Sequence, residues 1–256
     1  MLIAVNAGNS RVLLGGYEED GQVFSASIAT EPKLTRDDYA CKLQQVLLLY
    51  GVNVRRIHGG IVSSVVPSMV GVLEGALRLL GIHDVIEVSS GVKTGLNIRS
   101  EQPRQVGSDR VAAAVAARAK GKLPCVAITL GTATTFTALD GSGALVGSAI
   151  TAGVQLSLLA LREQAAQLPA VAIDAKDEGI LARNTVDAMR VGAVYGAASL
   201  VDGMVERFAE ALGETPYVVL TGELAPLVTP YLRIPFEYDE SLVLDGLHLI
   251  WKKNRG

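Results

Sequence analysis

A weak internal repeat constrains the fold of this chain more than any other feature. Each copy opens as a strand, a tight polar turn and a second strand, at 4–12 and again at 127–135. An acidic-glycine turn, a third strand and a helical pattern follow in both copies. The third strands fall at 23–29 and 144–150, and the helices at 35–50 and 156–167. Because a duplicated β-β-β-α opening is a supersecondary repeat, we expect two similar α/β domains facing one another.

The remaining segments alternate between strand and helix patterns. They predict strands at 60–65, 85–88 and 217–222, and helices at 68–80, 110–119 and 185–212. Ser108 or Asp109 is placed to cap the helix at 110–119, and an interruption is expected near Gly192 or Gly196 in the long helix. Since no linker marks a boundary, we place it near residue 118, giving domains 1–117 and 118–256.

Composition excludes several classes of protein. Hydrophobic residues make up 49% and charged residues 19% of the chain, and the formal net charge is −3, which is typical of a compact globular protein. Basic residues are scattered with few aromatics among them, so we expect no nucleic-acid surface. The uncharged stretch 141–161 approaches membrane-spanning length, but serines and glycines interrupt it. We therefore expect no membrane segment and a cytoplasmic location.

The two glycine-bearing turns of the repeat are the first candidate site. Gly8 is followed by Asn9 and Ser10, and Gly131 by Thr132. Backbone N–H groups in such turns, beside small residues, bind phosphate well. Each turn alone also fits an ordinary hairpin. Two turns in matching positions of duplicated domains favour a nucleotide whose phosphates lie between them.

The segment 107–110, Gly-Ser-Asp-Arg, is the second candidate. Asp109 precedes a helical pattern, so its carboxylate fits a helix cap. It equally fits a general base that takes a proton from a substrate hydroxyl attacking phosphorus. Arg110 is placed to stabilise developing negative charge. The two roles of Asp109 are compatible.

A third element is the segment 91–99, which carries two glycines together with Lys93 and Arg99. Its composition fits a loop that receives an anionic small molecule, and it also fits a solvated loop without a ligand. The sequence leaves both interpretations open.

Together these segments resemble the type III pantothenate kinases, a family that includes proteins named Bvg accessory factors. The resemblance covers essentially the whole chain, and the runs GVKTGLNIR and GTATTF are its most specific parts. The matching segments are 8–10, 63–67, 91–99, 107–110, 131–136, 168–169, 183–185 and 221–222. The resemblance implies a duplicated actin-like fold of ribonuclease H-like domains, as in acetate and sugar kinases, Hsp70 and actin.

The resemblance also implies an activity: ATP-dependent phosphorylation of pantothenate on its primary hydroxyl, the first step of coenzyme A synthesis. Asp109 would be the proton acceptor. The pantothenate site would comprise Gly107, Ser108, Arg110, Ser100, Asn184 and Thr185, the last two from across a homodimer interface. ATP would be held by Asn6, Ala7, Gly8, Asn9, Ser10, Arg11, Val12, Leu13 and Thr132. The expected ions are Mg²⁺ and a monovalent cation, K⁺ or NH₄⁺.

The chain departs from the family pattern at several of these positions. The family usually has Asp, for magnesium, where this chain has Asn6, and Asp, for the monovalent cation, where it has Thr129. A glycine of the family is Glu223 here, and a tyrosine of the pantothenate pocket is Ser100. Hard cations prefer anionic oxygens, so these changes weaken the cation sites without necessarily abolishing them. Two alternatives follow. One is a catalytically impaired paralogue that acts as a small-molecule-binding or regulatory protein. The other, suggested by Ser100 in place of the tyrosine, is a kinase for another hydroxylated acid.

Overall fold

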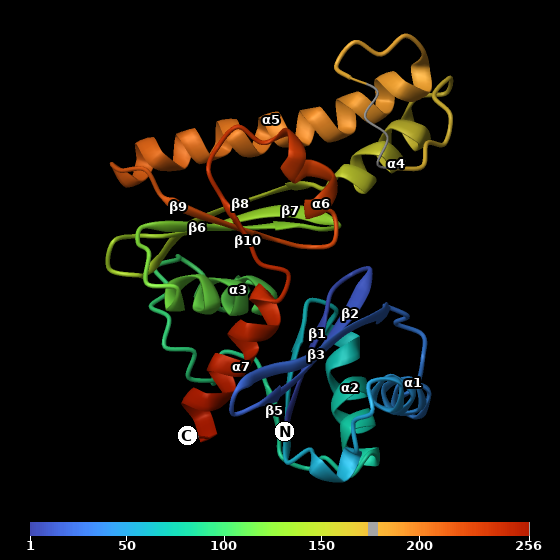
Figure 1. The fold of residues 1–256 in the computed structure, drawn as a ribbon, viewed down its shortest axis with the longest axis vertical. Helices are drawn as coiled ribbons and strands as arrows, with labels where there is room; N and C mark the ends of the chain where they lie inside the picture. The colour runs from blue at the N-terminus through green and yellow to red at the C-terminus, as the bar shows by residue number, and fades with distance from the viewer. Residues whose placement is uncertain (174–178, 256) are drawn as a thin grey trace. The chain divides into compact units, whose positions relative to one another are not determined.

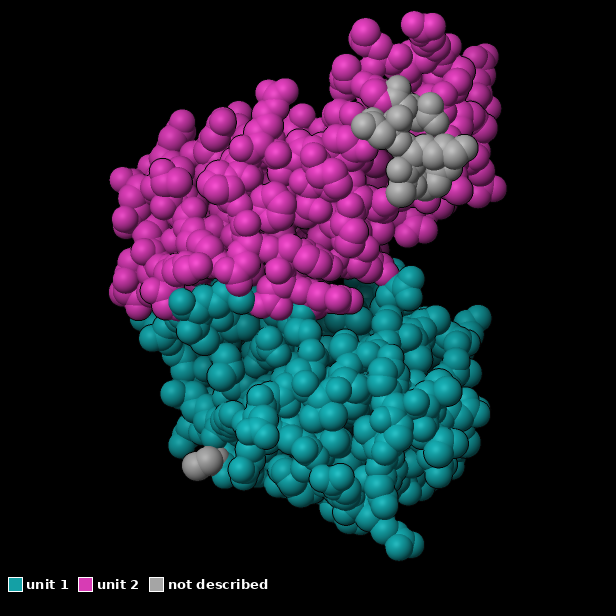
Figure 2. Space-filling view, in the orientation of Figure 1, with its two compact units in different colours: residues 1–120, 241–256 teal, residues 121–240 magenta. Residues whose placement is uncertain are grey.

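The computed structural model describes residues 1–173 and 179–255 (Figure 1). The chain divides into two compact units, coloured separately in Figure 2. The first comprises residues 1–120 and 241–256, and the second comprises residues 121–240. No helix in the described part of the chain is long and apolar enough to cross a membrane.

The first unit is built on a five-stranded sheet in the order β3-β2-β1-β4-β5. Strand β2 pairs antiparallel with both β1 and β3, whereas β4 pairs parallel with β1 and β5 pairs parallel with β4. The strands are β1 Leu2–Ala7, β2 Arg11–Glu18, β3 Gly21–Ala29, β4 Gly59–Ser64 and β5 Val85–Glu87. The helices are α1 Arg36–Leu49, α2 Pro67–Leu79, α3 Ser108–Ala119 and α7 Leu242–Arg255, with 3₁₀ turns at Val54–Arg56 and Pro103–Gln105.

The two faces of this sheet have different roles. Ile3, Val5 and Ala7 of β1 belong to one buried cluster with side chains of α1 and α2. Because successive strand residues point to opposite faces, Asn6 lies on the other face, which α7 covers along β1, β2 and β4 and α3 contacts at β4. One face is therefore a hydrophobic core, and the other carries the polar residues considered below.

The C-terminal helix α7 differs from the sequence prediction. Residues 241–256 were expected in the second domain, but they pack with the first unit. A Cβ atom at Gly246 would lie 1.9 Å from the carbonyl oxygen of Ala112, so the backbones of α7 and α3 touch there. The hydroxyl of Tyr17 also donates to Asp245 Oδ1 at 2.7 Å. These contacts join segments far apart in sequence, which local patterns do not reveal.

The second unit repeats the first. Its sheet, read as β8-β7-β6-β9-β10, has the strand order and orientations of β3-β2-β1-β4-β5. The elements are β6 Cys125–Leu130, β7 Ala133–Leu139, β8 Leu145–Ala152, β9 Tyr217–Thr221 and β10 Glu237–Tyr238, with helices α4 Val154–Gln164, α5 Thr185–Leu212 and α6 Ala225–Val228 and a 3₁₀ turn at Thr229–Tyr231. The duplicated α/β architecture is confirmed.

Helix α5 runs without a break, so the interruption expected near Gly192 or Gly196 is wrong. A glycine costs a helix roughly 1 kcal/mol relative to alanine. That cost is offset by packing, because Ala198, Val201 and Val205 of α5 are buried against Val126, Ile128 and Leu130 of β6. Burial of one face stabilises the helix as a single element.

Candidate active site

Asp109 lies in the first turn of α3. Gly107 is the N-cap residue just before the helix, and no side chain caps it, so the prediction that Ser108 or Asp109 is the cap is wrong. The Asp109 carboxylate instead accepts a hydrogen bond from the backbone N–H of Arg110 at 2.7 Å. The positive end of the helix dipole also favours a carboxylate here. Asp109 is thus held by the helix start without capping it.

Burial raises the pKa of Asp109 above its ordinary value. The Arg110 N–H and the Arg110 guanidinium act in the opposite direction, but the loss of solvation is the larger effect. A carboxylate with a raised pKa holds a proton more readily than an exposed one, which suits a general base. This environment is compatible with a general base, and the catalytic role of Asp109 stays a prediction.

Gly107 makes room for this carboxylate. A Cβ atom at position 107 would lie 2.6 Å from Asp109 Oδ1. The backbone of Gly107, at φ −54° and ψ 138°, is one that any residue adopts. Glycine at 107 therefore leaves space for the Asp109 carboxylate in its present position, and the backbone itself does not demand glycine.

Two serines of β4 connect the start of α3 to the sheet. Ser63 is buried, and its hydroxyl donates to Ser108 Oγ at 2.8 Å. The Ser108 hydroxyl donates in turn to the carbonyl oxygen of Ser64 at 3.2 Å. This chain of hydrogen bonds fixes the helix start that carries Asp109. Sequence reasoning missed Ser63 as a site residue, although a polar residue near the end of a buried strand was a usable signal.

Asn6 lies beside Ser63, its partner residue in the parallel pairing of β1 and β4. Its side chain is buried, and within 1–173 and 179–255 its Oδ1 is the one buried side-chain oxygen or nitrogen without a hydrogen-bond partner. A buried acceptor without a donor is costly. Amide oxygens are accepted ligands of hard cations, so this atom fits a divalent cation or a water bound to one.

The turn after Asn6 is the first of the two predicted phosphate turns. The N–H of Gly8 donates to the carbonyl oxygen of Arg11 at 2.9 Å, and Asn9 and Ser10 are exposed. Thr30, the residue after β3, holds the turn, because its hydroxyl donates to the Gly8 carbonyl at 2.8 Å. Of the predicted ATP-binding segment 6–13, the structure places Asn6 and Ala7 in β1, Gly8 to Ser10 in the turn, and Arg11 to Leu13 in β2.

The second predicted turn, Gly131–Thr132 of the second unit, is surrounded by close backbone contacts. A Cβ atom at Gly153 would lie 2.1 Å from the Gly131 carbonyl oxygen. One at Gly222, whose φ is +109°, would lie 2.3 Å from the carbonyl oxygen of Leu130. Glycines at 153 and 222 therefore let two other segments approach the turn that carries Thr132. Glu223, which follows Gly222, is exposed.

Thr129 lies in a row of hydroxyl-bearing residues across the second sheet. It pairs with Thr135 of β7 and with Thr221 of β9. Direct partners on adjacent strands share a face, and this face is opposite the one packed on α5. The position thus offers neutral hydroxyl oxygens. No group of three His, Cys, Asp or Glu able to hold a metal occurs within the described residues.

The remaining predicted residues are described each within its own unit. Ser100 is exposed, and its hydroxyl accepts from the N–H of Gln102 at 3.3 Å. Asn184 caps α5, since its Oδ1 accepts from the N–H of Asp187 at 2.9 Å. Thr185 begins the helix and lines an apolar cavity of about 320 Å³ between α4 and α5. Their predicted part in a substrate site across a dimer stays a prediction.

Comparison with known proteins decides the family. The model of the family described as type III pantothenate kinase matches residues 2–207. The chain is 38% identical over 256 residues to a type III pantothenate kinase of Geotalea daltonii, covering 100% of this chain and 99% of that protein. One from Pelobacter propionicus is also 38% identical, with complete coverage of both. This chain is a type III pantothenate kinase family member.

Solved structures agree on the fold of this pantothenate kinase family member. Component A of (R)-2-hydroxyglutaryl-CoA dehydratase from Acidaminococcus fermentans superposes with a TM-score of 0.58 at 12% identity, covering 99% of both chains. The activator of 2-hydroxyisocaproyl-CoA dehydratase from Clostridium difficile, with bound ADPNP, gives 0.55 at 12% identity, over 99% of this chain and 95% of that one. At such identities the likeness shows the fold alone, which is the duplicated actin-like fold.

Proposed function

We propose that this protein is a pantothenate kinase that transfers the γ-phosphoryl group of ATP to the primary hydroxyl of pantothenate. The product is 4′-phosphopantothenate, and the reaction is the first step of coenzyme A synthesis, carried out in the cytoplasm. The observation that carries the proposal is the half-buried carboxylate of Asp109 in the first turn of α3. Burial raises the pKa of this carboxylate. Full-length similarity to proteins named type III pantothenate kinases supports the substrate.

Asp109 acts as the general base in this proposal. As the hydroxyl oxygen of pantothenate forms a bond to the γ-phosphorus, Asp109 accepts the hydroxyl proton and the bond from phosphorus to the bridging oxygen breaks, releasing ADP. Gly107 leaves space for the carboxylate, and Ser63 with Ser108 fixes the helix start. Arg110, next in sequence, supplies positive charge near the developing anion.

The nucleotide side rests on the two turns, Gly8–Ser10 in the first unit and Gly131–Thr132 in the second. Both offer backbone N–H groups of the kind that bind phosphates. We assign the segment Asn6–Leu13 and Thr132 to ATP. When bound, Mg²⁺ neutralises charge on the phosphates, and the unpartnered Oδ1 of Asn6 is the atom that would hold it or its water.

The monovalent cation and the dimer complete the proposal. We assign K⁺ or NH₄⁺ to the hydroxyl row of Thr129, Thr135 and Thr221, whose oxygens are neutral. Neutral hydroxyl ligands do not balance the positive charge of a cation as a carboxylate does, so we expect the cation to bind weakly at this position. Asn184 and Thr185 are proposed to reach the pantothenate site of a second copy of the chain, with Ser100 at its edge.

Product analysis tests this function. The protein would be incubated with ATP, Mg²⁺ and K⁺, with pantothenate or a pantothenate analogue lacking the primary hydroxyl, and phosphorylated products identified by ³¹P NMR. We expect a new phosphomonoester signal with pantothenate and none with the analogue. An inactive wild type whose Asn6→Asp, Thr129→Asp variant gains turnover would contradict an active kinase and support the impaired alternative. Turnover of another hydroxy acid in preference to pantothenate would contradict the substrate.

A further inference from the structure

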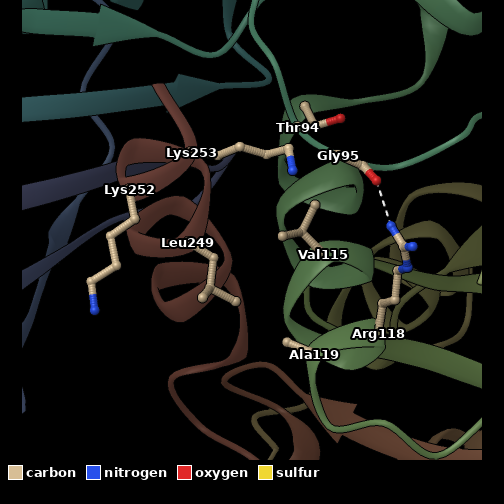
Figure 3. Close-up of a pocket in the computed structure, with 8 residues that line it drawn as sticks. All are labelled: Thr94, Gly95, Val115, Arg118, Ala119, Leu249, Lys252 and Lys253. Atoms are coloured by element: carbon tan, nitrogen blue, oxygen red, sulfur yellow. Dashed lines mark hydrogen bonds between the residues drawn. The ribbon is translucent and has the colours of Figure 1, made fainter. Parts of the chain in front are cut away.

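Helices α3 and α7 line an open surface cavity of about 490 Å³ in the first unit (Figure 3). The helix backbones touch where Gly246 faces Ala112, and side chains from later turns of both helices line the space beyond that contact. The lining residues are Thr94, Gly95, Val115, Arg118, Ala119, Leu249, Lys252 and Lys253. The volume falls within the range of small-molecule sites. The cavity thus arises from two helices that meet at small residues and separate beyond them.

The third wall is the loop around Gly95, part of the glycine-rich segment at 91–99. Asn254 of α7 ties it down, since Asn254 Oδ1 accepts from the N–H of Lys93 at 3.2 Å and its Nδ2 donates to the Lys93 carbonyl at 2.9 Å. On the other side the Arg118 guanidinium of α3 donates to the carbonyl oxygen of Gly95. Loop, α3 and α7 are therefore joined by side-chain hydrogen bonds around the cavity.

Gly95 is required by this arrangement. Its φ is +74°, in the left-handed region that favours glycine. A Cβ atom there would lie 2.7 Å from Cε and 3.0 Å from Nζ of Lys253. The Lys253 ammonium therefore lies directly against the loop, and Figure 3 shows its side chain extending toward Thr94 and Gly95. Lys252 extends away from them in the same view.

The charge of the lining is unbalanced. Arg118, Lys252 and Lys253 are basic, and no acidic residue is among the described residues that line the cavity. Asp84, the acid joined to the end of α7, is occupied by Arg255 through contacts of 2.7 to 3.2 Å. Lys253 makes no ion pair with any residue in the described ranges. Two cations from different helices thus face one space without a counter-charge.

We propose that this cavity is a binding site for a phosphomonoester, separate from the Asp109 site. Arg118 and Lys253 would contact the phosphate oxygens from opposite helices, as guanidinium and ammonium groups commonly do. Thr94 Oγ1 already accepts from the N–H of Leu96 at 3.2 Å, which leaves its hydroxyl hydrogen able to donate to the anion. Val115 and Leu249 offer an apolar wall to an organic group, which inorganic phosphate lacks.

The proposal also revises the anion loop suggested by the sequence. The segment at 91–99 forms one wall through Thr94 and Gly95, but the cations come from α3 and α7 and not from Lys93 or Arg99. Asp109 lies in the first turn of α3 and Arg118 in its last turn. At 1.5 Å per residue the two lie about 14 Å apart along the axis, so the phosphate site and the catalytic carboxylate share one helix without overlapping.

A simpler account of these residues makes a different prediction. Lys and Arg near helix C-termini interact favourably with the helix dipole without any ligand. In that case Lys252 and Lys253, adjacent on α7 and both exposed, would be equivalent toward added anions. Their different directions in the structure provide a matched pair of variants, Lys253→Gln and Lys252→Gln, each removing one charge.

The test is a titration of ¹⁵N-labelled full-length protein with phenyl phosphate, inorganic phosphate and chloride at constant ionic strength. The amide signal of Gly95 reports the cavity, and that of Gly107 reports the Asp109 site. We expect saturable shifts at Gly95 with phenyl phosphate and weaker binding of inorganic phosphate. Lys253→Gln should weaken phenyl phosphate about 10-fold, the size of one charge-assisted hydrogen bond. Lys252→Gln should change it less than about 3-fold.

Three results would overturn the proposal: no saturation at Gly95, equal weakening in both variants, or equal affinity for phenyl and inorganic phosphate. Equal affinity would mean that the cavity binds phosphate as an anion and that the organic group of the ester adds nothing. Because Gly107 is followed separately, loss of binding at Gly95 leaves the pantothenate kinase proposal unaffected. Failure of that proposal would likewise leave the Gly95 titration interpretable.

Discussion

Replacing Asn6 by aspartate tests whether this position is built for a cation. Asn6→Asp replaces the amide nitrogen of the side chain by an oxygen. Asn6 is 6% exposed, and its Oδ1 lacks a hydrogen-bond partner. Without a cation, the new carboxylate would be buried with at least one oxygen that has no hydrogen-bond donor. Loss of solvation would then raise its pKa above the value of about 3.9 that an unfolded Asp shows.

The size of the effect has an upper bound. A carboxyl group can avoid ionising by keeping its proton, so the part of the cost that depends on ionisation cannot exceed about three pKa units of 1.36 kcal/mol at pH 7, roughly 4 kcal/mol. We expect Asn6→Asp to lower the free energy of unfolding by about 2–4 kcal/mol in EDTA at pH 7. The loss should vanish below about pH 4, where both states are protonated. In a chain of this size this corresponds to roughly 5–15 °C in melting temperature.

Thermal melts of wild type and Asn6→Asp, in EDTA and in Mg²⁺ with an ATP analogue, provide the measurement. Mg²⁺ should restore most of the lost stability in the variant, because the cation supplies the missing counter-charge. Wild type should respond less. Equal stability of both proteins in EDTA would show that Asn6 is solvated, and a variant that Mg²⁺ does not rescue would show that no cation reaches it.

Three further predictions concern particular side chains. Gly107→Ala should lower kcat about 10²-fold by displacing the Asp109 carboxylate, while the melting temperature stays near that of wild type because the backbone suits alanine. Gly246→Ala should cost about 2–3 kcal/mol of stability in chemical denaturation, since its Cβ would lie 1.9 Å from the Ala112 oxygen, whereas Gly71→Ala in open space on α2 should stabilise slightly. Native protein should react with a thiol reagent at exposed Cys41 but not at buried Cys125, because burial raises the pKa of the Cys125 thiol to about 12. Equal reaction rates at the two cysteines would contradict the burial of Cys125 in the core.

The duplicated architecture was predictable because local sequence patterns of strands, turns and helices indicate it. Alternating strands and polar turns recur in the same order in both halves, and this order corresponds to the same sheet topology. The placement of α7 was not predictable, since it depends on Gly246 and Asp245 meeting Ala112 and Tyr17. Local patterns likewise predicted a break at Gly192 or Gly196, and the packing of α5 on β6 overrides it.

The candidate site was predictable only in part. Asp109 stood out as an acid at a helix start, but the local pattern could not separate a cap from a base. The structure shows that Asp109 does not cap α3 and that burial raises its pKa, and its role as a general base stays a prediction. Ser63 was missed because its partner, Ser108, lies 45 residues away in sequence. The cavity between α3 and α7 depends on side-chain directions, which no sequence pattern contains.

Single-turnover phosphoryl transfer by Asp109→Asn tests the central claim most directly. The amide keeps an oxygen for the Arg110 N–H but cannot accept the proton, so the rate should fall about 10²–10⁴-fold. Because the folded pKa of Asp109 is raised, its ionised form lowers stability above the unfolded pKa. The variant should therefore melt higher than wild type at pH 7 and converge with it in acid. A folded Asp109→Asn protein that transfers phosphate within about 3-fold of the wild-type rate would contradict the assignment of Asp109 as the base.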